Sequence, residues 1–106
     1  MNVFEVIAHP IRHRIITVLT SGEHTSGNLM EVVMHEFWVS RAAVSWHLAV
    51  LREHHYVTVR SDWNERWYRL DPRLLDLLGE EVKQLKRRWK HRIGSIERTD
   101  PLASLP

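Results

Sequence analysis

The chain has 106 residues, a length that suits one domain around one hydrophobic core. Hydrophobic residues make up 43% of the sequence and charged residues 26%, the ordinary balance of a globular protein, and the sequence has no cysteine. The lack of cysteine excludes disulfides, thiolate metal sites, cysteine nucleophiles and thiol redox switches.

The positive charge of the chain is concentrated near its C-terminus. The formal net charge is +2, and residues 83–92 (KQLKRRWKHR) contribute +6 with no acidic residue, so the rest of the chain sums to −4. This run is either a solvated helix face or part of a nucleic-acid contact, and the sequence leaves both interpretations open.

The sequence shows no sign of a membrane protein or of a signal peptide. It contains no run of about 18 apolar residues, the length that a membrane span needs. The first segment, MNVFEVIAHPIRHR, lacks a basic start followed by a long apolar stretch. We therefore expect a soluble cytoplasmic protein with no membrane partner.

The first half of the chain predicts four helices. The first covers residues 3–8 and stops near His9-Pro10, and the second starts at Pro10 and ends near Ser21-Gly22. Thr25 is the expected N-cap of a third helix that runs to Phe37. Ser40 is the expected N-cap of the fourth helix, so the third and fourth helices would form a helix-turn-helix pair.

Two strand-like segments follow the fourth helix. Residues 57–59 and 66–70 are rich in β-branched and aromatic residues, and the polar tip at residues 62–65 separates them. A helix followed by a two-stranded ribbon is the order of a DNA-reading helix and its wing. The sequence therefore favours binding to double-stranded DNA.

The last predicted helix begins at Asp71-Pro72, an N-cap followed by proline at the first helical position. It carries an apolar stripe at helical spacing, formed by Leu74, Leu78, Val82, Leu85, Trp89, Ile93 and Ile96. The stripe packs either against a second copy of the chain or against its own domain, and we favour the second copy. Residues 96–106 are expected to be a flexible tail.

Three segments together resemble the ArsR-type winged-helix repressors. FEVIAHPIRHRI (residues 4–15) is similar to the family pattern ALAxPxRxxIL, and VSRAAVSWHLAVLR (residues 39–52) is similar to VSqpaVSqHLkvLr. VTVR (residues 57–60) and RWYRL (residues 66–70) are similar to the family's wing. The resemblance covers residues 3–92, and it rests on the order and spacing of the three motifs.

The resemblance implies a mainly α fold with a two-stranded β-wing, a winged helix-turn-helix that dimerises through its first and last helices. Residues 1–95 would form the DNA-binding domain, with the dimerisation helix at about residues 72–95 and the tail at 96–106. A homodimer of this kind typically represses transcription from an inverted-repeat operator and is not an enzyme. The expected dimerisation residues are Phe4, Leu74, Leu78, Val82, Leu85 and Trp89.

The chain departs from the family pattern at four places. The third helix has about four extra residues, roughly one helical turn. Trp38 stands where the family often has glycine, in a turn that often needs a positive φ, and His55 likewise replaces a glycine after the fourth helix. Trp46 occupies a position often held by Gln, Lys or Arg, so its role on DNA is not assigned.

The expected DNA contacts lie on the fourth helix and the wing. They are Ser40, Arg41, Ala42, Ser45, Trp46, Arg60, Asn64 and Arg66. Arg41 is the candidate for reading guanine, with a phosphate contact or an intrahelical ion pair as the alternative. Asn64 fits a wing contact, although plain turn chemistry explains it better. His47 is expected to be a packing residue rather than a DNA contact.

We expect no metal site and no cofactor. The cysteine motif of metal-sensing family members is missing from residues 28–33, and the last helix lacks the Asp-x-His pair. The chain therefore resembles more closely the branch of the family without an evident metal site, and this resemblance implies an unknown inducer ligand. Two alternatives remain: a winged-helix protein-interaction module without operator binding, and a histidine-based sensor of metal or pH.

Overall fold

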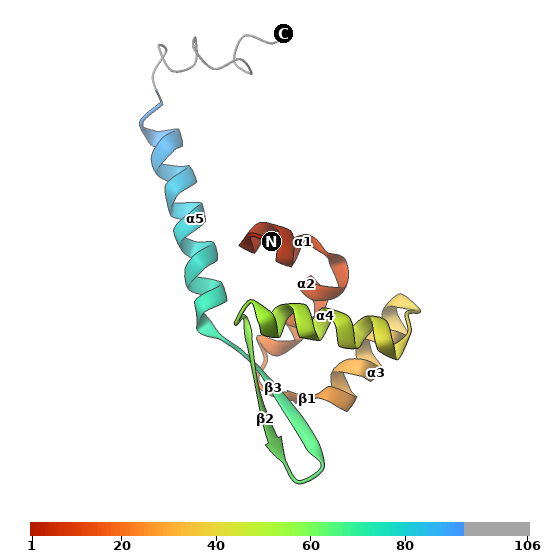
Figure 1. Ribbon diagram of the computed structural model, residues 1–106. Coiled ribbons are helices and arrows are strands. Elements are labelled where there is room, and N and C mark those ends of the chain that lie inside the picture. The colour runs from red at the N-terminus through yellow and green to blue at the C-terminus, as the bar shows by residue number, and fades with distance from the viewer. Residues whose placement is uncertain (93–106) are drawn as a thin grey trace.

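The computed structural model describes residues 1–92 of the chain. Its elements are α1 (Val3–Ala8), α2 (Pro10–Leu19), β1 (His24–Thr25), α3 (Ser26–Phe37), α4 (Arg41–Glu53), β2 (Val57–Asp62), β3 (Glu65–Leu70) and α5 (Pro72–Lys90). Helices α1 to α4 gather together, the hairpin β2–β3 extends from one side, and α5 projects away from them (Figure 1). The predicted tail and the stripe residues Ile93 and Ile96 lie outside the described residues.

The predicted helix starts are confirmed by side-chain caps. Thr25 accepts a hydrogen bond from the backbone N–H of Asn28 at 3.1 Å, and Ser40 accepts one from the N–H of Ala43 at 3.1 Å. Asp71 caps α5 by accepting from the N–H of Arg73 at 3.0 Å. Each cap satisfies a backbone donor that the helix itself leaves unpaired, and it typically contributes about 1 kcal/mol.

One hydrophobic core joins the helices to the sheet. Its fully buried side chains come from α1 to α5: Val6, Ile15, Leu29, Val33, Val44, Leu51 and Leu74. Burial of one such side chain contributes roughly 1.5–3 kcal/mol. Leu74 fixes the first turn of α5 to this core, so the core sets the direction in which α5 leaves the domain.

The sheet has three strands, not the two that the sequence predicted. Its order is β1-β3-β2, and β2 and β3 form an antiparallel hairpin with Val57 opposite Leu70 and Asp62 opposite Glu65. The two-residue strand β1 pairs antiparallel with β3, with His24 opposite Tyr68. A strand this short leaves no alternating pattern in the sequence, because its pairing depends on a distant partner.

The apolar stripe of α5 is exposed beyond its first two turns. Leu74 is buried and Leu78 is partly buried, whereas Val82, Leu85 and Trp89 are 45%, 58% and 67% exposed. Within the described residues, α5 packs mainly against α1. None of the described helices combines the length and the apolar character that crossing a membrane requires.

Candidate nucleic-acid interface

Helix α4 presents the predicted reading residues to solvent. Its apolar residues Val44, Leu48 and Leu51 are buried in the core. The residues between them, Arg41, Ala42, Ser45 and Trp46, are all exposed. The amphipathic spacing of the sequence therefore turns the candidate DNA contacts outward.

The N-terminus of α4 carries groups that can bind an anion. The Ser40 oxygen accepts the Ala43 N–H, which leaves the hydroxyl proton available to donate to a phosphate oxygen. The partial positive charge of a helix N-terminus favours a negative group at the same place. Arg41, the first residue of α4, has no ion-pair or hydrogen-bond partner for its side chain among residues 1–92.

A buried arginine holds α4 against α1 and α2. Arg12 donates from Nε to the carbonyl oxygen of Val6 at 2.8 Å, and its Nη1 lies 3.1 Å from Nδ1 of His47. Burial, followed by the nearby charges of His9 and Arg12, lowers the pKa of His47 to about 4. His47 is therefore neutral near pH 7, and its Nδ1 can accept from Arg12.

His47 is 6% exposed, which confirms the prediction that it is a packing residue. The His9 ring lies against it, with 4.2 Å between the ring centroids. Trp46 stands edge-on to His47, with 5.0 Å between centroids, and the Arg12 guanidinium carbon lies 5.9 Å from the centre of the Trp46 ring. These contacts fix the buried side of α4 and leave Trp46 57% exposed.

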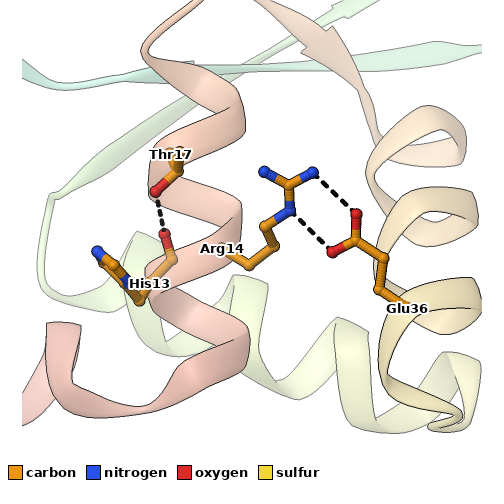
Figure 2. A network of polar contacts seen from close by, with 4 residues as sticks. All are labelled: His13, Arg14, Thr17 and Glu36. Atoms are coloured by element: carbon orange, nitrogen blue, oxygen red, sulfur yellow. Dashed lines mark hydrogen bonds and ion pairs between the residues drawn. The ribbon is translucent and has the colours of Figure 1, made fainter.

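An exposed ion pair joins α2 to α3, the first helix of the helix-turn-helix pair. Arg14 on α2 donates from Nε and Nη2 to the two carboxylate oxygens of Glu36 on α3, both at 2.8 Å (Figure 2). On α2 itself, the hydroxyl of Thr17 donates to the carbonyl oxygen of His13 at 2.9 Å. Because Glu36 lies near the end of α3, the pair holds the helix close to the turn that leads into α4.

The turn itself carries backbone strain. Trp38 has φ 55° and ψ 43°, in the left-handed region, and its N–H donates to the carbonyl oxygen of Met34 at 3.0 Å. His55, after α4, has φ 61°. The sequence predicted that the bulky Trp38 could change the geometry of this turn, but the structure keeps the positive φ despite the tryptophan. Both positions are ones where the family pattern has glycine.

The two arginines predicted on the wing differ in their contacts: among the described residues, Arg60 is ion-paired and Arg66 is not. Arg60 donates to Glu23 from Nε at 3.2 Å and from Nη2 at 2.9 Å, and it lies 3.6 Å from Asp62. Its guanidinium carbon is also 5.3 Å from the centre of the Trp67 ring. Arg66 is exposed and its side chain has no such partner in the described part of the chain. Asn64 is exposed at the tip beside Trp63.

A hollow beside the exposed face of α4 is lined by Arg52, a residue that the sequence prediction did not include. It lies between α3, α4 and β3, has a volume of about 620 Å³, and is lined by Arg52 and Arg66 among others. Arg52 follows Ser45 by seven residues, two turns of a helix, so it lies on the same side of α4. The seven-residue spacing from Ser45 is the feature of the sequence that could have predicted the place of Arg52 on this face.

No group of three His, Asp or Glu side chains in residues 1–92 could hold a metal ion.

No family model matches the chain. The Arsenical resistance operon repressor of Staphylococcus aureus is 30% identical over 75 residues, which cover 71% of this chain and 68% of the repressor. A crystal structure of a possible transcriptional regulator for arsenical resistance is 42% identical, with a TM-score of 0.68, over 80% of this chain and 84% of that one. The chain belongs to the ArsR family of transcriptional regulators.

Two further proteins are similar to this chain. The transcriptional repressor SdpR of Bacillus subtilis is 35% identical over 52 residues, which cover 49% of this chain and 53% of SdpR. A crystal structure of another ArsR family regulator has a TM-score of 0.74 over 86% of this chain and 90% of that one, and its 15% identity supports the fold alone. These relatives are transcriptional regulators and not enzymes, as expected from the sequence.

Proposed function

We propose that the chain is a homodimeric repressor that binds an inverted-repeat operator. In this proposal α4 of each protomer enters the major groove, and the hairpin β2–β3 lies against the backbone or the minor groove. The observation that carries the proposal is the exposed face of α4, where the capped helix start and the unpaired Arg41 stand side by side. Such a regulator acts where the DNA is, so we place it in the cytoplasm.

The proposed DNA contacts differ in the part of the DNA that each side chain suits. Ser40, Ser45 and Arg66 suit phosphate oxygens, which position the protein on DNA without reading the sequence. Arg41 suits the O6 and N7 acceptors of guanine, because its planar fork matches both at once. Trp46 offers an exposed ring that can pack on a thymine methyl or a sugar.

The dimer is supported by an apolar surface that one chain leaves open. Phe4 on α1 is 42% exposed, and the exposed stripe of α5 continues from Val82 through Leu85 to Trp89. Exposed apolar side chains aligned on one helix mark an interaction surface more often than isolated ones do. A second copy that covers this surface would place two copies of α4 for the two halves of an inverted repeat.

The test is a titration of the purified protein against the DNA upstream of its own gene. The titration is repeated at several salt concentrations, with a scrambled duplex of the same length as the control. The expected result is selective binding whose affinity falls steeply with salt, because each neutralised phosphate releases counterions. Equal, weak binding to operator fragments and scrambled DNA would favour a protein-interaction module instead.

A further inference from the structure

The hollow between α3, α4 and β3 has the dimensions and the lining of a small-molecule site. Its volume of about 620 Å³ lies inside the range of ligand pockets, roughly 300–1,000 Å³. Met30, Leu48 and Tyr68 line it with side chains that also belong to the hydrophobic core. The other lining residues are Ala49 and the polar or charged Ser26, Ser45, Arg52, Glu53 and Arg66. This mixed lining suits a small ligand that has both an apolar body and polar groups.

The lining of the hollow carries a net positive charge. Arg52 from α4 and Arg66 from β3 both line it, and neither side chain has an ion pair or hydrogen bond within residues 1–92. Glu53 contributes the one carboxylate among the lining residues. Two guanidinium groups against one carboxylate favour an anion, and a guanidinium fork matches a carboxylate in a bidentate arrangement.

Two further groups on the lining are ready for a hydrogen-bond donor. The Glu53 carboxylate and the Tyr68 hydroxyl have no hydrogen-bond partner in the described part of the chain. Both can accept a hydrogen bond from a ligand hydroxyl. We propose that the hollow binds a small aromatic hydroxy acid, with its carboxylate on Arg52 and Arg66 and its ring on Met30, Leu48 and Tyr68.

The position of the hollow gives this ligand a regulatory role. Ser45, a proposed phosphate contact, also lines the hollow, and so does Arg66 of the wing. A ligand carboxylate on the two arginines therefore takes the place of a DNA phosphate between α4 and the wing. The ligand is an inducer that competes with DNA; this second step rests on the proposed function.

The first experiment measures ligand binding without DNA. The full chain is titrated calorimetrically with 4-hydroxyphenylacetate, and the uncharged 4-hydroxyphenylacetamide serves as the control ligand. Saturable binding of the acid is expected, with binding of the amide weaker by roughly tenfold or more because it lacks the charge-assisted bonds. Absence of saturable binding by the acid overturns the inference whatever the protein does with DNA.

Variants then locate the site. Arg52→Gln and Arg66→Gln are each expected to weaken acid binding roughly tenfold. Arg69→Gln is the matched control, because Arg69 is also exposed on β3 but does not line the hollow. Circular dichroism checks that all three variants keep the wild-type fold. Equal affinity of all three variants for the acid would place the ligand elsewhere and overturn the site.

A competition experiment tests the inducer role separately. At a ligand concentration ten times its dissociation constant, the apparent dissociation constant for DNA should rise about tenfold if the two compete. If the acid binds but the DNA affinity stays constant, the inducer role is wrong. If both arginine variants lose DNA affinity and the acid does not bind, the hollow holds a backbone phosphate instead. If the acid binds and the protein shows no DNA affinity, the proposed function fails while the ligand site stands.

Discussion

Arg60 in the wing is bound in two hydrogen bonds by Glu23, which lies in the segment between α2 and β1. The hydrogen bond from Arg60 lowers the pKa of Glu23, so the carboxylate is charged at neutral pH and neutralises the arginine. Arg60 is one of the expected DNA contacts, yet its guanidinium has to leave Glu23 before it can bind a phosphate. The acidic partner therefore opposes the contribution of the wing to DNA binding.

Removing this acidic partner should strengthen DNA binding. Glu23→Gln weakens the hold on Arg60, so we expect a higher affinity and a salt dependence steeper by about one phosphate contact. Fluorescence anisotropy at several salt concentrations measures both quantities. Glu80→Gln on α5 makes the same change of charge outside the wing and is the control. An unchanged or lower affinity of Glu23→Gln would show that Arg60 does not contact DNA.

Arg41 should read one base position. Arg41→Ala should cost about 1–3 kcal/mol of binding free energy on the preferred operator and relax the preference at a single position. The measurement is a set of titrations with every single-base variant of one half-site, for the wild type and the variant. A uniform loss of affinity on all operators would assign Arg41 to a phosphate instead.

Trp38 should limit the stability of the domain through its backbone. A non-glycine residue in the left-handed region costs roughly 1–2 kcal/mol, and Trp38 is 92% exposed, so its ring contributes little packing in return. Trp38→Gly should raise the free energy of unfolding in urea by roughly 0.5–1 kcal/mol. Trp38→Ala is the matched variant, because it removes the ring and keeps the strain. Equal stability of the two variants would contradict this account.

The buried His47 should make stability depend on pH. The pKa of His47 is lowered to about 4 in the folded chain and has the ordinary value of 6.5 when unfolded. Protons therefore bind the unfolded state preferentially, so stability is complete above pH 6.5 and falls as the pH drops towards 4, by up to about 3 kcal/mol. Urea titrations across this range measure the loss.

The contribution of this histidine can be separated from that of other groups. His47→Gln removes the titrating ring, so its curve of stability against pH should be flatter between pH 6.5 and 4. His13→Gln changes an exposed histidine on α2 and should follow the wild type. If His47→Gln has the same slope as the wild type, another group causes the pH dependence.

Leu85 should be needed for the dimer but not for the fold. It is 58% exposed in the single chain, so Leu85→Glu leaves the core intact. The charge would be buried in the proposed interface, and we expect sedimentation to show a monomer where the wild type is a dimer. Gln84→Glu adds the same charge beside the stripe and should remain dimeric. A dimeric Leu85→Glu would place the interface elsewhere.

The helices and their starts could be predicted from the sequence alone. The caps Thr25, Ser40 and Asp71 act on backbone groups only a few residues away, so their effect is local and visible in the sequence. The same holds for the exposed face of α4, because helical periodicity alone separates the buried Val44 from the exposed Ser45.

Only the tertiary structure decided which residues from distant parts of the chain contact one another. The pairing of β1 with β3, the ion pair of Glu23 with Arg60, and the contact of Arg12 with His47 join segments far apart in the chain. The same is true of the hollow, which is lined both by Arg52 of a helix and by Arg66 of a strand. Periodicity says which face a residue occupies, but the packing of distant segments in one core determines its neighbours. For this reason the sequence alone predicted a reading helix and a wing. Which arginines form ion pairs and which are left without a partner depended on how the chain folds.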